Sequence, residues 1–462
     1  MVDSTRTEGS DPRKSRFTEV DGGTWAERVS RDLKGRAVSE LVDSEVDGLQ
    51  LEPLYTAGGA SGPPVEWPSA SWQISVLVDA SKPEAAVEAA HNAAAQGAEA
   101  ILLRIAHSRR KRGVPLGDLT ELEAFCTAIG DTDLEVHLDA GAAANSMLGA
   151  RSRNLRTMGL DPMAALAQGA ERDEFEALLA GSLQELASAR DGHHGATPLA
   201  IDTSFYHGAG ASHAQEVGFA LASAIEMARR ADGYGVPPEE TLKLMGFRMA
   251  VGTDFMKSLA KLRAARLCWR QIGEVLRSPV PMTIHALPSS LHQTSRAKWV
   301  NVLRNTAYCF AASLGGADRI TLTSHEVAAD SEGAFGRRLA CNTQHVLRLE
   351  SRLDQVRDPA AGSYYLESLS LEIAEHAWRL FQEIEGQGGM LQSLRSGWVG
   401  DAVAALRARR LDALSKGTSP ILGVTLYPEP QVEEALREER APEPGPGIHP
   451  RPLELDVAGE GP

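Results

Sequence analysis

Three histidines stand where apolar runs of the chain end, and imidazole is the side chain that most readily exchanges a proton near neutral pH. His207 follows the run 199–203, while His285 and His292 flank the end of the run 282–287. If these runs are parallel strands of a barrel, their carboxyl ends share one face, where such barrels place catalytic groups. The residues alone leave two interpretations open for each: a catalytic group or a hydrogen-bonded structural histidine.

Other catalytic motifs do not accompany these histidines. The sequence has no GxxxxGK[ST] phosphate loop, no GxSxG nucleophile elbow and no histidine pair at the spacing of a metal site. The four cysteines form no CxxC and lie in helical patterns, which favours buried thiols in a reducing cytoplasm: Cys126, Cys268, Cys309 and Cys341. A helix over 254–276 carries Lys261, Arg263 and Arg266, either as a charged outer face or as ion pairs between helices or subunits. No complete catalytic set and no metal site is therefore predicted.

Alternating strands and helices must position these side chains. Short apolar runs predict buried parallel strands over 74–79, 100–105, 134–140, 199–203, 247–252, 282–287 and 319–323. Helical patterns separate them over 83–97, 212–231, 254–276, 297–314 and 332–353. We predict an α/β protein built on a (β/α)8 TIM-type barrel whose eighth strand lies within 141–175. A doubly wound open sheet is the alternative.

The ends of the chain differ in composition from this barrel region. We predict a disordered segment over 1–16 and an N-terminal arm over 17–60, whose Phe17 and Trp25 would contact another subunit. The barrel then occupies 61–428, and a Pro- and Glu-rich tail over 429–462 is predicted to be disordered.

Composition narrows the function classes. The 462 residues carry 62 acidic and 47 basic side chains, a net charge of −15, which disfavours nucleic acids and anionic membranes as partners. No run of about 18 apolar residues and no apolar leader at the N-terminus occurs, so a cytoplasmic location is expected.

The second half of the chain carries strings that resemble the methylmalonyl-CoA mutase family. They are AKLRAAR (260–266), HQTS (292–295), LRNTAYCFAASLGGADRITLTSHE (303–326), RLACNTQHVLRLES (338–351), DPAAGSYYLESL (358–369) and ILGVTLYP (421–428). LEPLYT (51–56) and DTSFYHGAGA (202–211) are similar to the family's small, or β, subunit. The resemblance implies a (β/α)8 barrel which, in catalytic chains, is threaded by acyl-CoA and capped by adenosylcobalamin on a C-terminal domain. Such a domain is not expected here, because this chain ends soon after its barrel.

The resemblance also identifies positions where catalytic groups are replaced. Catalytic chains carry a tyrosine on the first strand where this chain has Leu77, and histidines where it has Phe205 and Leu291. A two-residue gap would instead align Tyr206 and His207 with the family's Tyr-His pair. Near residue 247, an arginine (Arg248) stands in place of an aromatic residue. DGHHGA (191–196) is similar to the cobalamin motif Asp-x-His-x-x-Gly, but its glycine comes one position too early. We predict that it is a solvated loop.

The resemblance implies a first hypothesis, the non-catalytic small subunit of a cobalamin-dependent mutase that interconverts methylmalonyl-CoA and succinyl-CoA in propionate metabolism. This pseudoenzyme would form a heterodimer with a catalytic α subunit that carries the acyl-CoA and the adenosylcobalamin, and would bind no cofactor itself. The alternative is an active acyl-CoA mutase barrel that works with a separate cobalamin-binding subunit. Its substrate pocket would then be lined by His207, His292, Gln293, Thr294 and Thr323.

Overall fold

The protein is described here from a computed structural model. The described residues are 21–44, 46–56, 65, 67, 69–107, 109–110, 112–192, 196–326, 333–428 and 446–457. Phe17 and the predicted segment 1–16 lie outside them, as do His193 and His194. Within this part of the chain, none of the helices combines the length and hydropathy needed to cross a membrane.

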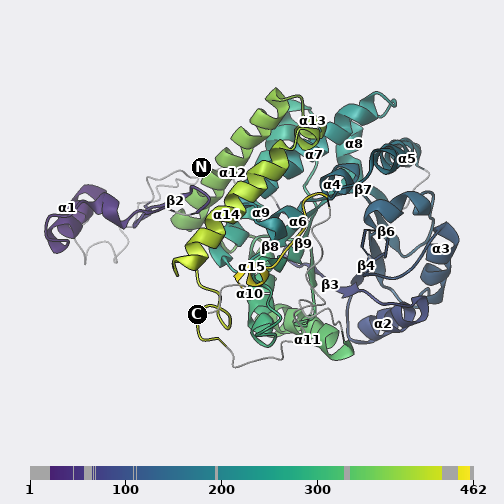
Figure 1. Cartoon of the computed structure of the whole chain (residues 1–462), viewed down its shortest axis with the longest axis horizontal. Helices are drawn as coiled ribbons and strands as arrows, with labels where there is room; N and C mark the ends of the chain where they lie inside the picture. The colour runs from purple at the N-terminus through teal and green to yellow at the C-terminus, as the bar shows by residue number, and fades with distance from the viewer. Residues whose placement is uncertain are drawn as a thin grey trace, which may run out of the picture.

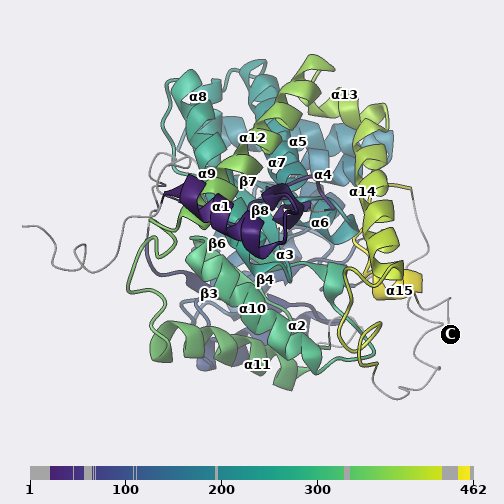
Figure 2. The same ribbon diagram turned by 90° about the vertical axis from the view of Figure 1, so that its left-hand side faces the viewer.

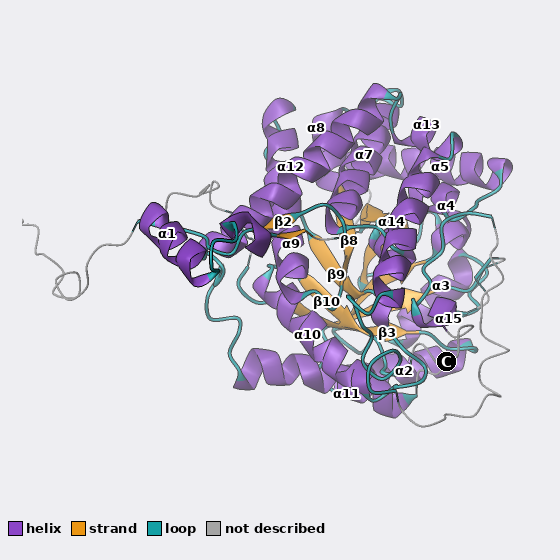
Figure 3. Ribbon diagram, turned by 60° about the vertical axis from the view of Figure 1, so that its left-hand side comes forward, coloured by secondary structure: helices purple, strands orange, loops and turns teal. Residues whose placement is uncertain are grey.

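Eight parallel strands close into a barrel, which confirms the predicted (β/α)8 architecture (Figure 3). In their order around the barrel, the strands are β10 (Arg319–Leu322), β3 (Gln73–Val78), β4 (Ala100–Arg104), β5 (Glu135–Asp139), β6 (Leu155–Leu160), β7 (Thr197–Asp202), β8 (Met245–Val251) and β9 (Ile284–Pro288). Their central residues are almost fully buried, because helices cover the barrel from outside.

The eighth strand is β6, within the range where it was expected. Its sequence, LRTMGL, is broken by Arg156, Thr157 and Gly159, so it lacks the apolar run of the other strands. Gly159 has a φ of +68°, and a Cβ there would lie 2.1 Å from the carbonyl oxygen of Leu138 on β5. The strand therefore needs glycine where it approaches its neighbour, and its pairing with β5 and β7 is irregular.

Helices follow the strands and form the outer layer (Figure 1). They are α2 (Pro83–Ala95), α3 (Leu119–Ala128), α4 (Pro162–Ala167), α5 (Arg172–Arg190), α6 (Ser204–Ala209), α7 (His213–Asp232), α8 (Pro238–Thr241), α9 (Phe255–Val275), α10 (Val300–Leu314) and α11 (Ala334–His345). After them come α12 (Tyr364–Gly386), which packs against α7 and α9, and then α13 (Met390–Arg395) and α14 (Trp398–Ser415).

The basic residues of α9 are buried between helices and strands. Lys261 is paired with Glu216 of α7, Arg263 with Asp358, and Arg266 with Asp318. The interpretation as a charged outer face is wrong. The alternative of ion pairs between helices is confirmed for Lys261, whereas Arg263 and Arg266 pair with aspartates outside the helices. The packing of α12 over α9 leaves this helix little contact with solvent.

An N-terminal arm stands away from the barrel. It consists of α1 (Gly22–Asp32) and a two-stranded sheet of β1 (Asp43–Ser44) and β2 (Gln50–Leu51). In Figures 1 and 2, α1 projects from the side of the molecule that also carries α10. The root of the arm is attached to α12, where the N–H of Gln50 donates to Glu372 and the ring of Tyr55 packs edge-on against that of Tyr365.

The C-terminal part differs from the predicted disordered tail. Residues 446–457, which we call the C-terminal strap, pack against the barrel and end in the short helix α15 (Glu454–Val457). The rest of the predicted tail, 429–445 and 458–462, lies outside the described residues. Leu453 and Glu454 of the strap are buried, so this segment has anchoring residues that the surrounding Pro- and Glu-rich composition conceals.

Candidate functional site at the barrel mouth

A cavity of about 630 Å³ lies at the barrel mouth, meaning the carboxyl ends of the strands. Its lining comes from most of the strands, from the loops that follow them and from the C-terminal strap. This is the face on which barrels of this type build their sites, because the strand-to-helix loops converge there.

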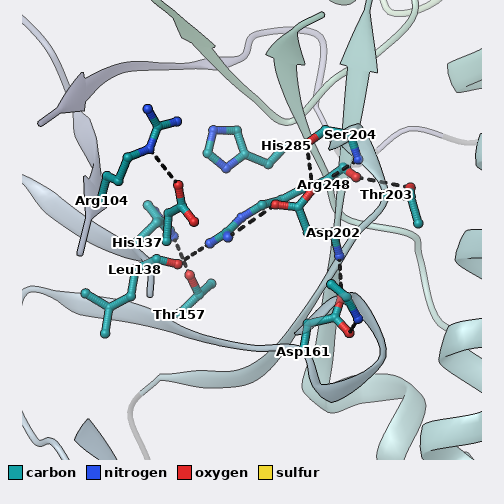
Figure 4. Close-up of polar contacts among 12 residues, drawn as sticks. Arg104, His137, Leu138, Thr157, Asp161, Asp202, Thr203, Ser204, Arg248 and His285 are labelled. Atoms are coloured by element: carbon teal, nitrogen blue, oxygen red, sulfur yellow. Dashed lines mark hydrogen bonds and ion pairs between the residues drawn. The ribbon is translucent and has the colours of Figure 1, made fainter. Parts of the chain in front are cut away.

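Arg248 of β8 lines the cavity and lies at the centre of a cluster of polar contacts (Figure 4). Its guanidinium donates to the carbonyl oxygen of Leu138 on β5 and lies 3.7 Å from the carboxylate of Asp202 on β7. Only 4% of Arg248 is exposed. The side chain therefore crosses the barrel interior, where its positive charge contacts groups of two other strands, β5 and β7.

Asp202 and Asp161 form the acidic partners beside Arg248. Burial raises the pKa of Asp202, although the charge of Arg248 and hydrogen bonds from Ser204 oppose that effect. Burial also raises the pKa of Asp161 to about 7. The backbone N–H groups of Ala164 and Asp202, which donate to its carboxylate over 3.0 and 2.7 Å, act in the opposite direction and lower that pKa. Asp161 is thus a carboxyl group that can exchange a proton near neutral pH.

The wall beyond β4 and β5 carries paired charges. Asp139 accepts from Arg104 over 3.0 Å and from Arg110 over 2.8 Å, and these three residues line the cavity. Arg104 also pairs with Asp79, which lies outside the lining and accepts from Arg112 over 2.5 Å. Burial would raise the pKa of Asp139, but the neighbouring arginines outweigh it and hold that pKa well below its usual range. These guanidinium groups are therefore already matched by carboxylates of the same wall.

Among the described residues, the opposite wall carries no charged side chain. Gln293 and Thr323 line it together with Ser290, and Nε2 of Gln293 donates to Asn305 over 3.1 Å. Among the described residues, Oε1 of Gln293 and the hydroxyls of Ser290 and Thr323 find no hydrogen-bond partner. This wall could accept hydrogen bonds from a polar ligand.

Two of the three replaced positions face the same cavity. Leu77 and Phe205 are buried and line it. Leu291 is fully buried beside the cavity, in a separate apolar cluster with Leu453 of the strap. None of the three side chains has a group that could donate or accept a proton.

The histidines of the strand ends make structural hydrogen bonds. Nδ1 of His207 lies 2.7 Å from the hydroxyl of Ser289, and Nε2 of His285 lies 2.7 Å from that of Thr321. His292 lies 3.2 Å from Thr253. Burial lowers the pKa of His207 and His285 well below the usual value and that of His292 to about 3, so all three are neutral at pH 7.

The structure thus brings only part of the expected pocket together. Gln293 and Thr323 line the cavity, whereas His207, His292 and Thr294 do not belong to its lining. Thr294 is buried and accepts a hydrogen bond from Arg304 over 3.1 Å. Trp25 lies on α1 of the arm, far from the cavity in sequence and in space (Figure 1).

Sequence reasoning missed the acidic half of this site. Asp139 and Asp202 each stand at the end of an apolar run. That position alone could have predicted that their carboxylates lie at the barrel mouth. Asp161 follows the irregular strand β6, which is not an apolar run, so the sequence pattern did not predict its position. Across the described residues, no group of three or more His, Cys, Asp or Glu side chains is placed to hold a metal ion.

Comparisons of the sequence with a family model and with known proteins point to one family. A family model described as methylmalonyl-CoA mutase matches residues 186–443. The Streptomyces virginiae protein named methylmalonyl-CoA mutase small subunit is 34% identical over 453 residues, which cover 92% of this chain and 72% of that protein. A Mycobacterium tuberculosis protein (strain H37Rv), named probable methylmalonyl-CoA mutase small subunit, is 31% identical over 423 residues, covering 84% of this chain and 66% of its own length.

A third relative, the small subunit from Propionibacterium freudenreichii subsp. shermanii, is 34% identical over 302 residues, which cover 63% of this chain and 47% of that protein. The chain therefore spans between about half and three quarters of the length of these three relatives.

Proposed function

The chain belongs to the methylmalonyl-CoA mutase family, and we propose that it is the small, non-catalytic subunit of a cobalamin-dependent mutase that interconverts methylmalonyl-CoA and succinyl-CoA. Its role would be to bind and stabilise a larger catalytic subunit. The names of the relatives, which describe small subunits, support a larger partner.

The proposal rests on the side chains that occupy the barrel interior. Arg248 crosses the interior and is held by Leu138 and Asp202, while Leu77 and Phe205 cover the cavity wall with apolar groups. A rearrangement of a thioester needs donors placed at the reacting atoms, and each such group contributes a few kcal/mol to the transition state. The resemblance places those donors at positions that are apolar here.

Adenosylcobalamin is proposed to sit on the partner subunit. The mouth of this barrel does not fit a cap the size of a corrin ring, because the C-terminal strap lies across it and lines the cavity with Pro446, His449 and Pro450. We therefore derive no step through this cofactor on the present chain. We also propose a cytoplasmic location, which the reduced, buried cysteines support.

The proposed contact surface lies on the side of the arm. On α1, Trp25, Val29 and Leu33 fall on one helical face, and no residue of that helix is fully buried. On the side of the barrel from which α1 projects (Figure 2), Leu303 and Trp299 of the α10 region are 67% and 55% exposed. Apolar groups that stand this far into solvent are typical of a protein interface. Phe17 lies outside the described residues, and its part in the contact stays a prediction from the sequence.

The test is co-purification with the larger mutase chain of the same genome, with activity measured for each chain alone and for the pair. We expect a one-to-one complex that is active only when the larger chain is present. Leu303→Asp should weaken the complex by at least about tenfold, since it buries a charge in the interface. Tyr234→Asp is the matched control, because Tyr234 is similarly exposed (57%) but lies between α7 and α8, away from the arm.

The alternative function, an active barrel served by a separate cobalamin-binding subunit, is supported by the open hydrogen-bonding groups of Gln293 and Thr323. It predicts turnover when only a stand-alone cobalamin protein is added, and loss of that turnover in Gln293→Ala. The subunit proposal predicts that Gln293→Ala leaves the activity of the pair unchanged. Turnover without the larger chain would overturn the subunit proposal.

A further inference from the structure

The C-terminal strap crosses the barrel mouth and is held by three backbone hydrogen bonds. The N–H groups of Ile448, Arg451 and Leu453 donate to the carbonyl oxygens of Ala167, Gly208 and Leu291 over 2.7, 3.0 and 2.9 Å. Ala167 ends α4, Gly208 lies in α6 and Leu291 follows β9, so the strap links the segments that follow three strands of the half of the barrel formed by β6 to β9. In Figure 1 the yellow segment runs from α4 past α6 to α15.

Charged groups fix the far end of the strap. The carboxylate of Glu454 accepts from the N–H groups of Ser295 and Arg296 over 2.8 and 3.2 Å, and from the hydroxyl of Ser295 over 3.1 Å. Only 4% of Glu454 is exposed. Asp456 is paired with Arg407 of α14. A carboxylate that is buried with several donors is a specific anchor, because each unmet donor would cost free energy.

An apolar seat completes the attachment. Leu453 packs in a buried cluster with Leu291, Leu414, Ile421 and Val424. Leu291 is one of the positions where the resemblance expects a catalytic histidine. Here its side chain supports the strap and its carbonyl oxygen accepts the hydrogen bond of Leu453. The replacement thus has a structural consequence besides the loss of a polar group.

Glycines of the barrel loops let the strap approach closely. A Cβ on Gly169, whose φ is +87°, would lie 1.9 Å from the carbonyl oxygen of Pro446. A Cβ on Gly208 would lie 2.8 Å from Cβ of Pro450 and 2.6 Å from the hydroxyl of Ser290. The loops after β6 and β7 are therefore shaped to receive the strap.

We propose that the barrel mouth is a binding site for the chain's own C-terminal strap, which closes the cavity above Arg248 to large ligands while it is seated. Pro446, His449 and Pro450, which we call the roof, line the same cavity as Arg248. A bulky molecule reaches the wall of Ser290 and Gln293 only after the strap leaves. This inference goes beyond the subunit role and holds whether or not the chain is catalytic.

The test uses a thiol under the roof of the cavity. In the full chain, Ser290→Cys is nearly isosteric, and the four native cysteines are buried, so labelling reports on residue 290. The probe is a maleimide carried by a long polyethylene glycol. Leu453→Asp releases the strap, and we expect the labelling rate to rise by at least about tenfold, since access then no longer awaits transient opening.

A second site separates release of the strap from unfolding. Thr127→Cys places a thiol on the exposed part of α3, away from the strap, and its labelling rate should not change with Leu453→Asp. If that rate also changes, the strap is released instead with the double substitution Glu454→Gln and Asp456→Asn, and both labelling rates are measured again. This double substitution weakens the charged anchors and leaves the apolar cluster around Leu453 unchanged. Equal labelling of Ser290→Cys with the strap seated and released would overturn the proposal.

Discussion

Nζ of Lys261 lies 2.5 Å from Oε2 of Glu216, and neither side chain is exposed to solvent. The pair joins α9 to α7 and reaches the barrel, because Lys261 also donates to the carbonyl oxygen of Ala250 and Glu216 accepts the N–H of the same residue. Burial raises the pKa of Glu216 and lowers that of Lys261, while each charge opposes the effect on the other. The pair thus holds two helices and β8 together only as long as both members are present.

Lys261→Met should lower the free energy of unfolding by about 3–5 kcal/mol, because it leaves the Glu216 carboxylate buried without a cation. The double variant Lys261→Met with Glu216→Gln should recover much of that loss, since the remaining amide is neutral. Urea unfolding of the three proteins measures both effects. Lys416→Met is the control: Lys416 and Asp412 form an exposed pair at 2.6 Å, for which about 1 kcal/mol or less is expected. A double variant as unstable as the single one would contradict this account.

These buried ions show which part of the fold could be predicted from sequence. The apolar runs predicted the strands because a parallel strand of a barrel is buried on both faces and is therefore a nearly continuous run of apolar residues. The same reasoning failed for Lys261, because a basic residue on a helix is normally exposed, and only the later packing of α12 over α9 buries it. Its partner Glu216 lies 45 residues away, and no local pattern links the two.

The candidate site was predictable only in part, for a related reason. Gln293 and Thr323 were found through the resemblance, and both line the cavity. The paired Arg and Asp residues of the mouth come from different strands, so their arrangement depends on barrel closure. The C-terminal strap was missed because its composition is that of a disordered tail, whereas its anchoring depends on single residues such as Glu454.

Asp161 should make the stability of the protein depend on pH. Its pKa is raised to about 7 by burial, above the ordinary value of 3.8, so the folded state holds a proton that the unfolded state releases at lower pH. Its stabilising contribution is present below about pH 4 and is lost as the pH rises to about 7. The stability of the natural protein relative to Asp161→Asn should fall over this range by at most about 4 kcal/mol.

Urea unfolding at intervals between about pH 4 and about pH 8 measures this difference. Asp118→Asn is the control, because the Asp118 carboxylate caps α3 by accepting an exposed hydrogen bond from the N–H of Glu121 and does not line the cavity. Parallel stability curves for the natural protein and Asp161→Asn would show that Asp161 does not hold the extra proton.

Arg248→Leu should destabilise the protein by about 3 kcal/mol at neutral pH, because the Asp202 carboxylate loses its cation and the Leu138 carbonyl loses its hydrogen-bond donor in the barrel interior. The loss should be smaller near pH 5. Burial already raises the pKa of Asp202, and removal of Arg248 would raise it further, so the carboxyl group can take up a proton there. Chemical unfolding at both pH values tests this, and Arg36→Leu, in an exposed pair with Glu40, should change little at either. An effect of Arg248→Leu that is equal at both pH values would point to lost packing rather than lost charge.

Gly316 holds the turn between α10 and β10 against Trp67. Its φ is +79°, and a Cβ there would lie 2.7 Å from the indole ring, which is buried. Gly316→Ala should therefore cost about 2–4 kcal/mol, the sum of the strained backbone and the steric overlap. Gly417 follows α14 with a similar φ of +72° and has nothing within 4 Å of the added Cβ, so Gly417→Ala should cost only the backbone part, about 1 kcal/mol. Thermal and urea unfolding of the two variants separate the contributions, and equal losses would mean that the indole of Trp67 moves aside freely.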